Sequence, residues 1–497
     1  MHLLETNVSP TRWFVALLTL ACAACPATVS DVCHDIICGV PVPPGCDPTA
    51  DVQTASACVV DSYGVFVDAT NGNDGSPGTQ KAPLKTVHAA LGALTGKPRV
   101  YLCDGTYSEQ VVIDGAVSLY GGFACGTWTY NGTRARLAPA DEGFALVVKH
   151  ASLPVTLADL EVTAKDATTP SASSIAVFLS QNTSRVDFRR VRVRAGNALL
   201  TPPPTTTTPY NVVVDTQGNP TAGNPPASVS GGGEKTCTCS VFGKSTGGAG
   251  GNASTTSVPA MPGKSGSADP ASPITGVADG SGGGASGGTC TVGGAGYNGA
   301  PGNVGGGANV LGVLDENGWT PASGQSGGPG RSGGGGGGGG GGTATGGGGG
   351  GCGGCGGSGG AGGSGGGSSI AAIAFDTPLK IDASELIAGS PEPGAAGGSG
   401  GIASRGGAGG GVTCGGGAGG SGGGGGAGGN SFAILFQGQA PAVDAQTVLT
   451  VAQRGASAGR GGPLGDGAGQ AGAGDVSKSG NAGSDGKAGL AETIHAL

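Results

Sequence analysis

Apolar residues recur at alternate positions in four short segments that lie far apart in the chain. These segments are residues 144–148, 175–179, 370–374 and 432–436. A second apolar set begins eleven residues after the first in three copies, and nine residues after it in the third. Alternation over five residues predicts a strand with one buried face. Two strands and a bend within about twenty residues predict one coil of a β-solenoid.

A lone coil has no neighbour against which to bury its apolar face, so we expect the four copies to stack on one another. Stacked coils rise about 4.8 Å each, which piles equivalent inward side chains into a continuous core. The positions predicted to point inward are 144/146/148, 175/177/179, 370/372/374 and 432/434/436, followed by Val155/Leu157/Leu160/Val162, Val186/Phe188/Val191/Val193, Leu379/Ile381/Ser384/Leu386 and Val443/Ala445/Val448/Thr450.

Before the first copy, strand-like and helix-like patterns alternate. Residues 63–69, 100–103 and 117–123 have the alternation and β-branching of strands. Residues 71–78 are rich in turn formers. Residues 83–94 carry apolar side chains at a helical period and predict a short helix.

The sequence of this stretch resembles the N-terminal opening of right-handed parallel β-helix proteins of the pectate-lyase-like superfold. The resemblance rests on Phe-Val-Asp-Ala-Thr-Asn-Gly-Asn-Asp-Gly-Ser-Pro-Gly-Thr at 66–79, Pro-Leu-Lys-Thr-Val at 83–87, Val-Tyr-Leu-Cys-Asp-Gly-Thr-Tyr at 100–107 and Leu-Tyr-Gly-Gly-Phe at 119–123. It covers about residues 60–140 and is similar to the N-terminal capping region of a β-helix domain family of unknown function. It implies a fold alone, because this opening precedes enzymes and non-enzymes alike. The whole layout also looks like exported, glycine-rich bacterial surface proteins and lipoproteins.

Glycine occupies 113 of the 497 positions, mostly in the second half of the chain. If the coils are spatial neighbours, residues 201–367 and 389–429 must be loops that leave the solenoid and return to one face. Glycine has the largest backbone entropy to lose on ordering, which favours solvated, disordered loops. The alternative is that glycine strands pack side by side in a polyglycine II arrangement. The tail ends in a helix-capable segment, residues 488–497.

The N-terminus predicts export. A weakly positive start precedes the apolar run 13–24, which is too short to span a bilayer. Small residues around Cys22 suit signal cleavage. The stretch also resembles an imperfect lipoprotein box, in which Cys22 or Cys25 is the candidate lipidation site.

The 14 cysteines agree with export, because disulfides persist in oxidising compartments. Four of them crowd a Pro-rich lead segment and admit three pairings. Cys103 and Cys125 flank strands and are candidates to pair with each other, and disulfides between glycine loops account for Cys352 and Cys355 better than zinc or redox chemistry does. The candidate disulfide cysteines are Cys33, Cys38, Cys46, Cys58, Cys103, Cys125, Cys237, Cys239, Cys290, Cys352, Cys355 and Cys414.

Charge and motif content exclude several activities. A net charge of −8 and a pI near 5.1 argue against nucleic-acid binding. The chain has no adjacent Asp pair and no Gly-His-Gly, so it lacks the signature of polygalacturonase-like hydrolysis. In the predicted stack Asp159 faces Arg190 and Glu161 faces Arg192, which we interpret as an outward charge ladder; a sugar-binding or catalytic groove is the alternative.

The sequence therefore predicts an all-β, right-handed parallel β-helix with a short N-terminal capping helix and long glycine-rich insertions. We expect an exported structural or adhesive protein of the cell envelope or surface, with no catalytic residues, metal or cofactor. The alternatives are a polysaccharide lyase or hydrolase and a carbohydrate-binding module. Envelope polysaccharide or other surface proteins are the expected partners, and a lipid anchor is the only expected membrane contact. The predicted segments are a signal peptide at 1–24, a Cys-rich lead at 25–58, cap and first coils at 59–200, insertions at 201–367 and 389–429, single coils at 368–388 and 430–452, and a tail at 453–497.

Overall fold

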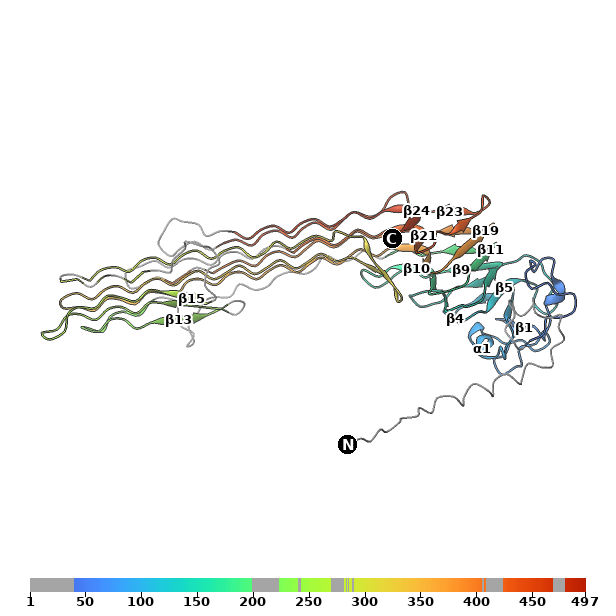
Figure 1. Cartoon of the computed structure of the whole chain (residues 1–497), viewed down its shortest axis with the longest axis horizontal. Coiled ribbons are helices and arrows are strands. Elements are labelled where there is room, and N and C mark those ends of the chain that lie inside the picture. The colour runs from blue at the N-terminus through green and yellow to red at the C-terminus, as the bar shows by residue number, and fades with distance from the viewer. Residues whose placement is uncertain are drawn as a thin grey trace, which may run out of the picture.

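A computed structural model describes residues 40–198, 223–239, 243–269, 281, 282, 284, 286, 287, 290–404, 406, 407, 423–467 and 479–497. Two parts are evident in Figure 1: a stacked β-body and a long bundle of extended strands that projects from it. We call the bundle the rod.

The body consists of three parallel sheets, to which successive coils contribute one strand each. Sheet 1 runs β1 (Gly64–Val67), β2 (Arg99–Cys103), β5 (Ser118–Phe123), β8 (Val155–Ala158), β11 (Val186–Arg189), β19 (Leu379–Asp382) and β22 (Ala442–Val443). Sheet 2 runs β4 (Val111–Asp114), β7 (Leu146–Lys149), β10 (Ser174–Ser180), β18 (Ser369–Phe375), β21 (Ser431–Gln437) and β24 (Ala491–Ala496). Sheet 3 runs β3 (Thr106–Tyr107), β6 (Ala135–Leu137), β9 (Leu160–Thr163), β12 (Arg192–Arg194), β20 (Glu385–Ile387) and β23 (Val448–Thr450). This is the predicted parallel β-helix.

The predicted stacking of distant segments is confirmed. In sheet 2, Val177 pairs with Leu146 on one side and with Ala372 on the other, although Ala372 lies far along the chain. In sheet 1, Val186 pairs with both Val155 and Leu379. The hydrophobic core between the sheets is continuous through these coils.

The inward prediction is wrong at the first position of each copy, residues 144, 175, 370 and 432, because the outer face of sheet 2 is also covered by apolar contacts and its strands β10, β18 and β21 are buried on both faces. Ile175, Ile370 and Phe432 pair in register but belong to a second apolar cluster on the outer face of the sheet. A hairpin of β16 (Gly312–Asp315) and β17 (Gly318–Pro321) covers this face. Its Trp319 is buried there and donates Nε1–H to Ser368 Oγ at 3.1 Å.

The last coil has a different register from the prediction. Val443 pairs with Ile381 rather than with Leu379, and Leu449 rather than Thr450 pairs with Leu386. The bend of this coil therefore has a different length, and a one-residue shift exchanges the faces of a strand. Ala445, Val448 and Thr450, all predicted to point inward, are exposed.

Both ends of the body differ from the predicted helices. The capping helix α1 (Val87–Gly92) is shorter than the expected 83–94, because Asp74 binds the backbone N–H groups of Lys85 and Thr86 before it starts. The Thr86 hydroxyl then caps the helix by accepting from Ala89 N–H. The C-terminal segment is not helical: β24 pairs with β21 and extends sheet 2. Pairing with β21 decides the conformation of this segment, although its sequence is capable of forming a helix.

The remaining regular elements are small. A 3₁₀ turn, η1 (Ser56–Cys58), lies in the lead segment, and β13 (Lys235–Thr238), β14 (Lys244–Gly247) and β15 (Ser267–Asp269) form an antiparallel sheet in the rod. No helix within the described ranges has the length and apolarity that crossing a membrane requires.

Candidate functional site: the polyglycine rod

The glycine-rich excursions leave and re-enter the body at one corner. The chain exits into them after β12, β20 and β23, which all belong to sheet 3. It returns into β18, β21 and β24, which all belong to sheet 2. Because the coils are stacked, the excursions start side by side and run out together as the rod (Figure 1).

The segment 324–342 forms the centre of the rod and bonds to neighbours on three sides. Every third residue from 324 to 339 donates its N–H to the segment 348–363, at 2.8–3.0 Å. The residues one position later, every third residue from 325 to 340, donate their N–H groups to the segment 291–306 at 2.8–2.9 Å. Of the remaining residues, 335, 338 and 341 donate their N–H groups to residues 261–267 at 2.9–3.4 Å. A period of three is that of the polyproline II helix, so this is a polyglycine II arrangement.

This packing explains the ten consecutive glycines at 333–342. A Cβ built on Gly338 would lie 2.1 Å from the carbonyl oxygen of Ala249, and one on Gly341 would lie 1.9 Å from that of Asn252. Both contacts are with backbone, which has no rotamer to change. The prediction of disordered glycine loops is therefore wrong for the described part of the rod, and the polyglycine II alternative is confirmed.

Two disulfides clamp the rod. Cys237 is bonded to Cys352 and Cys239 to Cys355, which joins β13 and the residue after it to the segment 348–363. The four cysteines form their own buried cluster. Cys290 is a free thiol that contacts Thr345. The predicted cysteines Cys22, Cys25, Cys33, Cys38 and Cys414 lie outside the described residues.

The far end of the rod is poor in charge and partly apolar. The chain reverses there between Gly342 and Thr345, whose backbone groups are hydrogen-bonded. The described residues of 223–233, 248–263, 284–294 and 337–349 converge on this end and contain no Asp, Glu, Lys or Arg. Glu234 and Lys264 follow the first two of these segments directly and form an exposed ion pair at 3.6 Å. We call these segments the tip. Four exposed apolar side chains lie on it: Val229, Val258, Met261 and Val292, exposed by 46%, 45%, 46% and 70%.

The charged residues of the first coils are engaged in ion pairs. As predicted, Asp159 meets Arg190, whose Nη2 lies 2.7 Å from its carboxylate. Asp159 is nevertheless buried and not part of an outward ladder, because it sits at the bend between β8 and β9 with φ of 55°. Arg190 also pairs with Asp51 at 2.7 Å and so ties the lead segment to the coils. Burial alone would raise the pKa of Asp51, but hydrogen bonds from Arg190 and Gln53 lower it below the ordinary 3.8.

The second predicted pair does form an outward ladder on sheet 3. Glu161 lies between Arg136 at 3.5 Å and Arg192 at 4.0 Å, and Arg192 reaches Glu385 at 2.6 Å on the following coil. All four side chains are partly exposed. This geometry supports cross-strand ion pairing by Glu161. The Glu161 side chain also lines a cleft together with Arg136, Asp166 and Arg194.

We expect Arg190→Met to lower the free energy of unfolding of the body by about 2–3 kcal/mol, because it leaves the buried Asp159 carboxylate without its cation. The part of this stabilisation that comes from the pair of Arg190 with Asp51 is fully present above about pH 4 and is lost as the pH falls through the depressed pKa of Asp51. Chemical denaturation followed by circular dichroism measures it. Arg192→Met, on the exposed ladder, is the matched control and should change stability by about 0–1 kcal/mol. Equal losses in the two variants would contradict the assignment.

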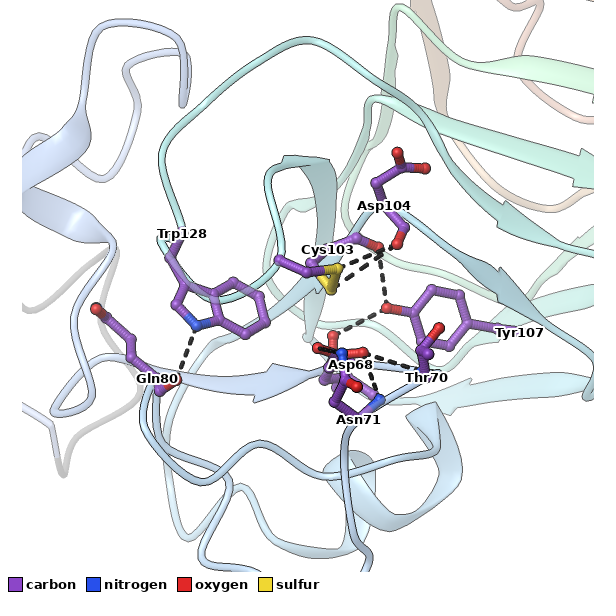
Figure 2. Close-up of a disulfide and its surroundings, with 10 residues drawn as sticks. Asp68, Thr70, Asn71, Gln80, Cys103, Asp104, Tyr107 and Trp128 are labelled. Atoms are coloured by element: carbon purple, nitrogen blue, oxygen red, sulfur yellow. Dashed lines mark hydrogen bonds between the residues drawn. A yellow bond between two sulfur atoms is a disulfide. The ribbon is translucent and has the colours of Figure 1, made fainter.

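The cap contains one further cluster with metal-binding residue types. Asp68 lies beside Cys103 and Cys125, but these cysteines are bonded to each other, as Figure 2 shows, and offer no thiolate. The Asp68 carboxylate accepts from Thr70 N–H and Asn71 N–H, at 2.9 Å each. The residues do not fit a metal site, and the cluster is a turn braced by a disulfide.

The buried Tyr107 hydroxyl completes this brace. It donates to the carbonyl oxygens of Val67 at 2.9 Å and Cys103 at 3.0 Å, alternatives that place it between β1 and β2 (Figure 2). Burial raises the pKa of the Tyr107 phenol above its ordinary value, which keeps the hydroxyl protonated and able to donate.

The fold thus defines a parallel β-helix protein, and comparison with known proteins adds one finding. Residues 70–126 match a family described as "Protein of unknown function (DUF1565)". The match covers the helix, the disulfide and the first coils, and not the rod. No curated protein and no solved structure matches the chain.

Proposed function

We propose that this protein is an exported structural or adhesive protein of the cell envelope or surface, in which the β-helix is a base and the rod holds the tip away from it. The hydrogen bonding of the rod on three sides carries the proposal. A disordered linker of the same composition would collapse toward a random coil. The 18 steps between the 19 ordered residues 324–342, at about 3.1 Å each, extend about 56 Å. The disulfides support an oxidising compartment.

The tip is the contact surface in this proposal. The described residues of the tip carry no charge of their own, and the ion pair of Glu234 and Lys264 beside it is neutral as a pair. Its exposed apolar side chains are set among small hydroxyl residues such as Thr255 and Thr343. Such a surface suits adhesion to another envelope component better than electrostatic capture of an ion or a nucleic acid.

The test is adhesion of beads that carry the purified mature protein to whole cells of the source. Replacing Val258, Met261 and Val292 by Asp should lower bead adhesion at least tenfold. Replacing Val310 and Ile402, which are exposed elsewhere on the glycine-rich excursions, by Asp is the matched control and should leave adhesion unchanged. Equal adhesion of the two variants would overturn the role of the tip, and finding the native protein in the cytoplasm would overturn the export. Mass spectrometry of the mature amino terminus distinguishes a lipidated Cys22 or Cys25 from a free amine.

A further inference from the structure

The two ends of the β-helix are built differently. At the N-terminal end, α1 packs against β1, β2 and β4, and its Val87 and Ala90 are buried in the main core. At the C-terminal end, β22, β23 and β24 are the outermost strands of the three sheets, and in the described part of the chain no strand pairs with their free edges. We call these three strands the open end. Their free edges present unpaired backbone N–H and C=O groups, through which an edge strand binds a further strand.

Core positions of the body are left uncovered at the open end. Three apolar side chains of the preceding coil are fully buried, namely Ile381, Leu386 and Ile434. Their pairing partners in the last coil are Val443, Leu449 and Ile494. Val443 and Leu449 are only half-buried, and Ile494 is 38% exposed. The hydrophobic core therefore reaches the end of the stack and stops there without a cover.

The open end has few charges, and its acids are engaged within the same chain. Asp444 is the single charged residue between 436 and 451, and its carboxylate accepts from Ala383 N–H at 3.1 Å and from the Thr447 hydroxyl at 2.6 Å. In β24, the Glu492 carboxylate contacts His495 Nδ1 at 2.8 Å. Edge strands of natural proteins are protected from pairing by charges, above all lysine, and by proline. The sequence of β24 contains neither of these two residue types.

We propose that the open end binds the open end of a second copy of this chain, so that two β-helices associate about a two-fold axis. Stacking head to tail is blocked, because α1 covers the N-terminal end of each copy. Two open ends, in contrast, have the same cross-section and the same apolar surface, and their contact continues the coil-on-coil packing of the body.

The longest strand of the last coil is β24, so we expect it to form the centre of the contact, antiparallel to β24 of the second copy. In a register centred on Ile494, Glu492 faces Ala496 of the second copy, and no like charges are opposed. This inference is independent of the proposed adhesive role of the tip.

The test is the oligomeric state of the purified mature protein, measured by sedimentation equilibrium at concentrations up to about 100 µM. We expect a monomer–dimer equilibrium with a dissociation constant in the micromolar range or tighter. Amide exchange in peptides that contain β24 should slow as the dimer forms, because the free edge of this strand becomes paired. A protein that stays monomeric, or that assembles into species larger than a dimer, would overturn the two-fold contact.

Ile494→Lys and Val448→Lys are the informative variants, because both side chains are already exposed, by 38% and 55%, in the single chain. The two-fold axis brings each new charge into the contact twice, and this repulsion should weaken the dimer at least tenfold. Val112→Lys is the matched control, since Val112 is 50% exposed on β4 at the opposite end of sheet 2. It should leave the dissociation constant unchanged. Equally stable dimers in all three variants, or an equal loss in all three, would remove the open end as the interface.

Discussion

We expect Gly338→Ala to disorder the middle of the rod while leaving the β-helix intact. The new methyl group would lie 2.1 Å from the carbonyl oxygen of Ala249, and no side chain can move aside to admit it. Overpacking a close-packed site costs about 1–3 kcal/mol, and a clash with backbone lies at or beyond the upper end. An opening cost of about 3 kcal/mol corresponds to roughly hundredfold faster amide exchange in the segments that bond to 335–341.

Hydrogen exchange with mass spectrometry separates the rod from the body in one experiment. Gly284→Ala is the control, because a Cβ at that rod position meets nothing within 4 Å. It should leave exchange unchanged in every peptide. If Gly338→Ala also left the rod protected, the polyglycine II packing would be refuted, whereas loss of protection in the body would show that the two parts do not fold separately.

The stacking of the coils was readable from the sequence because it depends on side chains. Each coil that buries alternate side chains has the same alternation of apolar residues. This alternation is recognisable on both sides of the long insertion between Leu179 and Ile370. The two-sided burial of Ile175 and Ile370 was not readable, since it depends on a hairpin from an insertion. The Asn-Gly pair at 317–318 between short apolar runs is a hairpin signal that would have found it.

The order of the rod was not readable, because glycine carries no side chain to specify a neighbour. The body favours the packed state, because the glycine-rich segments leave the stacked coils side by side and already aligned. Backbone hydrogen bonds at 2.8–3.0 Å then repay part of the entropy that favours disorder.

We expect removal of both rod disulfides to destabilise the rod strongly. In this variant Cys237, Cys239, Cys352 and Cys355 are all replaced by Ala. Each bond closes a long loop, because the bonded cysteines are 115 and 116 residues apart in the sequence. Closing a loop of about 100 residues lowers the entropy of the unfolded chain by an amount worth about 4.7 kcal/mol. Because the two loops are almost the same, the second bond adds little to the first.

Removing one bond alone should therefore destabilise the rod far less than removing both, which is a measurable departure from additivity. Exchange of peptides from 333–351 reports on the rod, and that of peptides from 144–163 reports on the body. The converse variant, Cys103→Ala with Cys125→Ala, opens a short loop in the cap and should weaken the body and spare the rod. A rod that keeps its protection without Cys237, Cys239, Cys352 and Cys355 would be held by its hydrogen bonds alone, and the clamp assigned to these cysteines would be wrong.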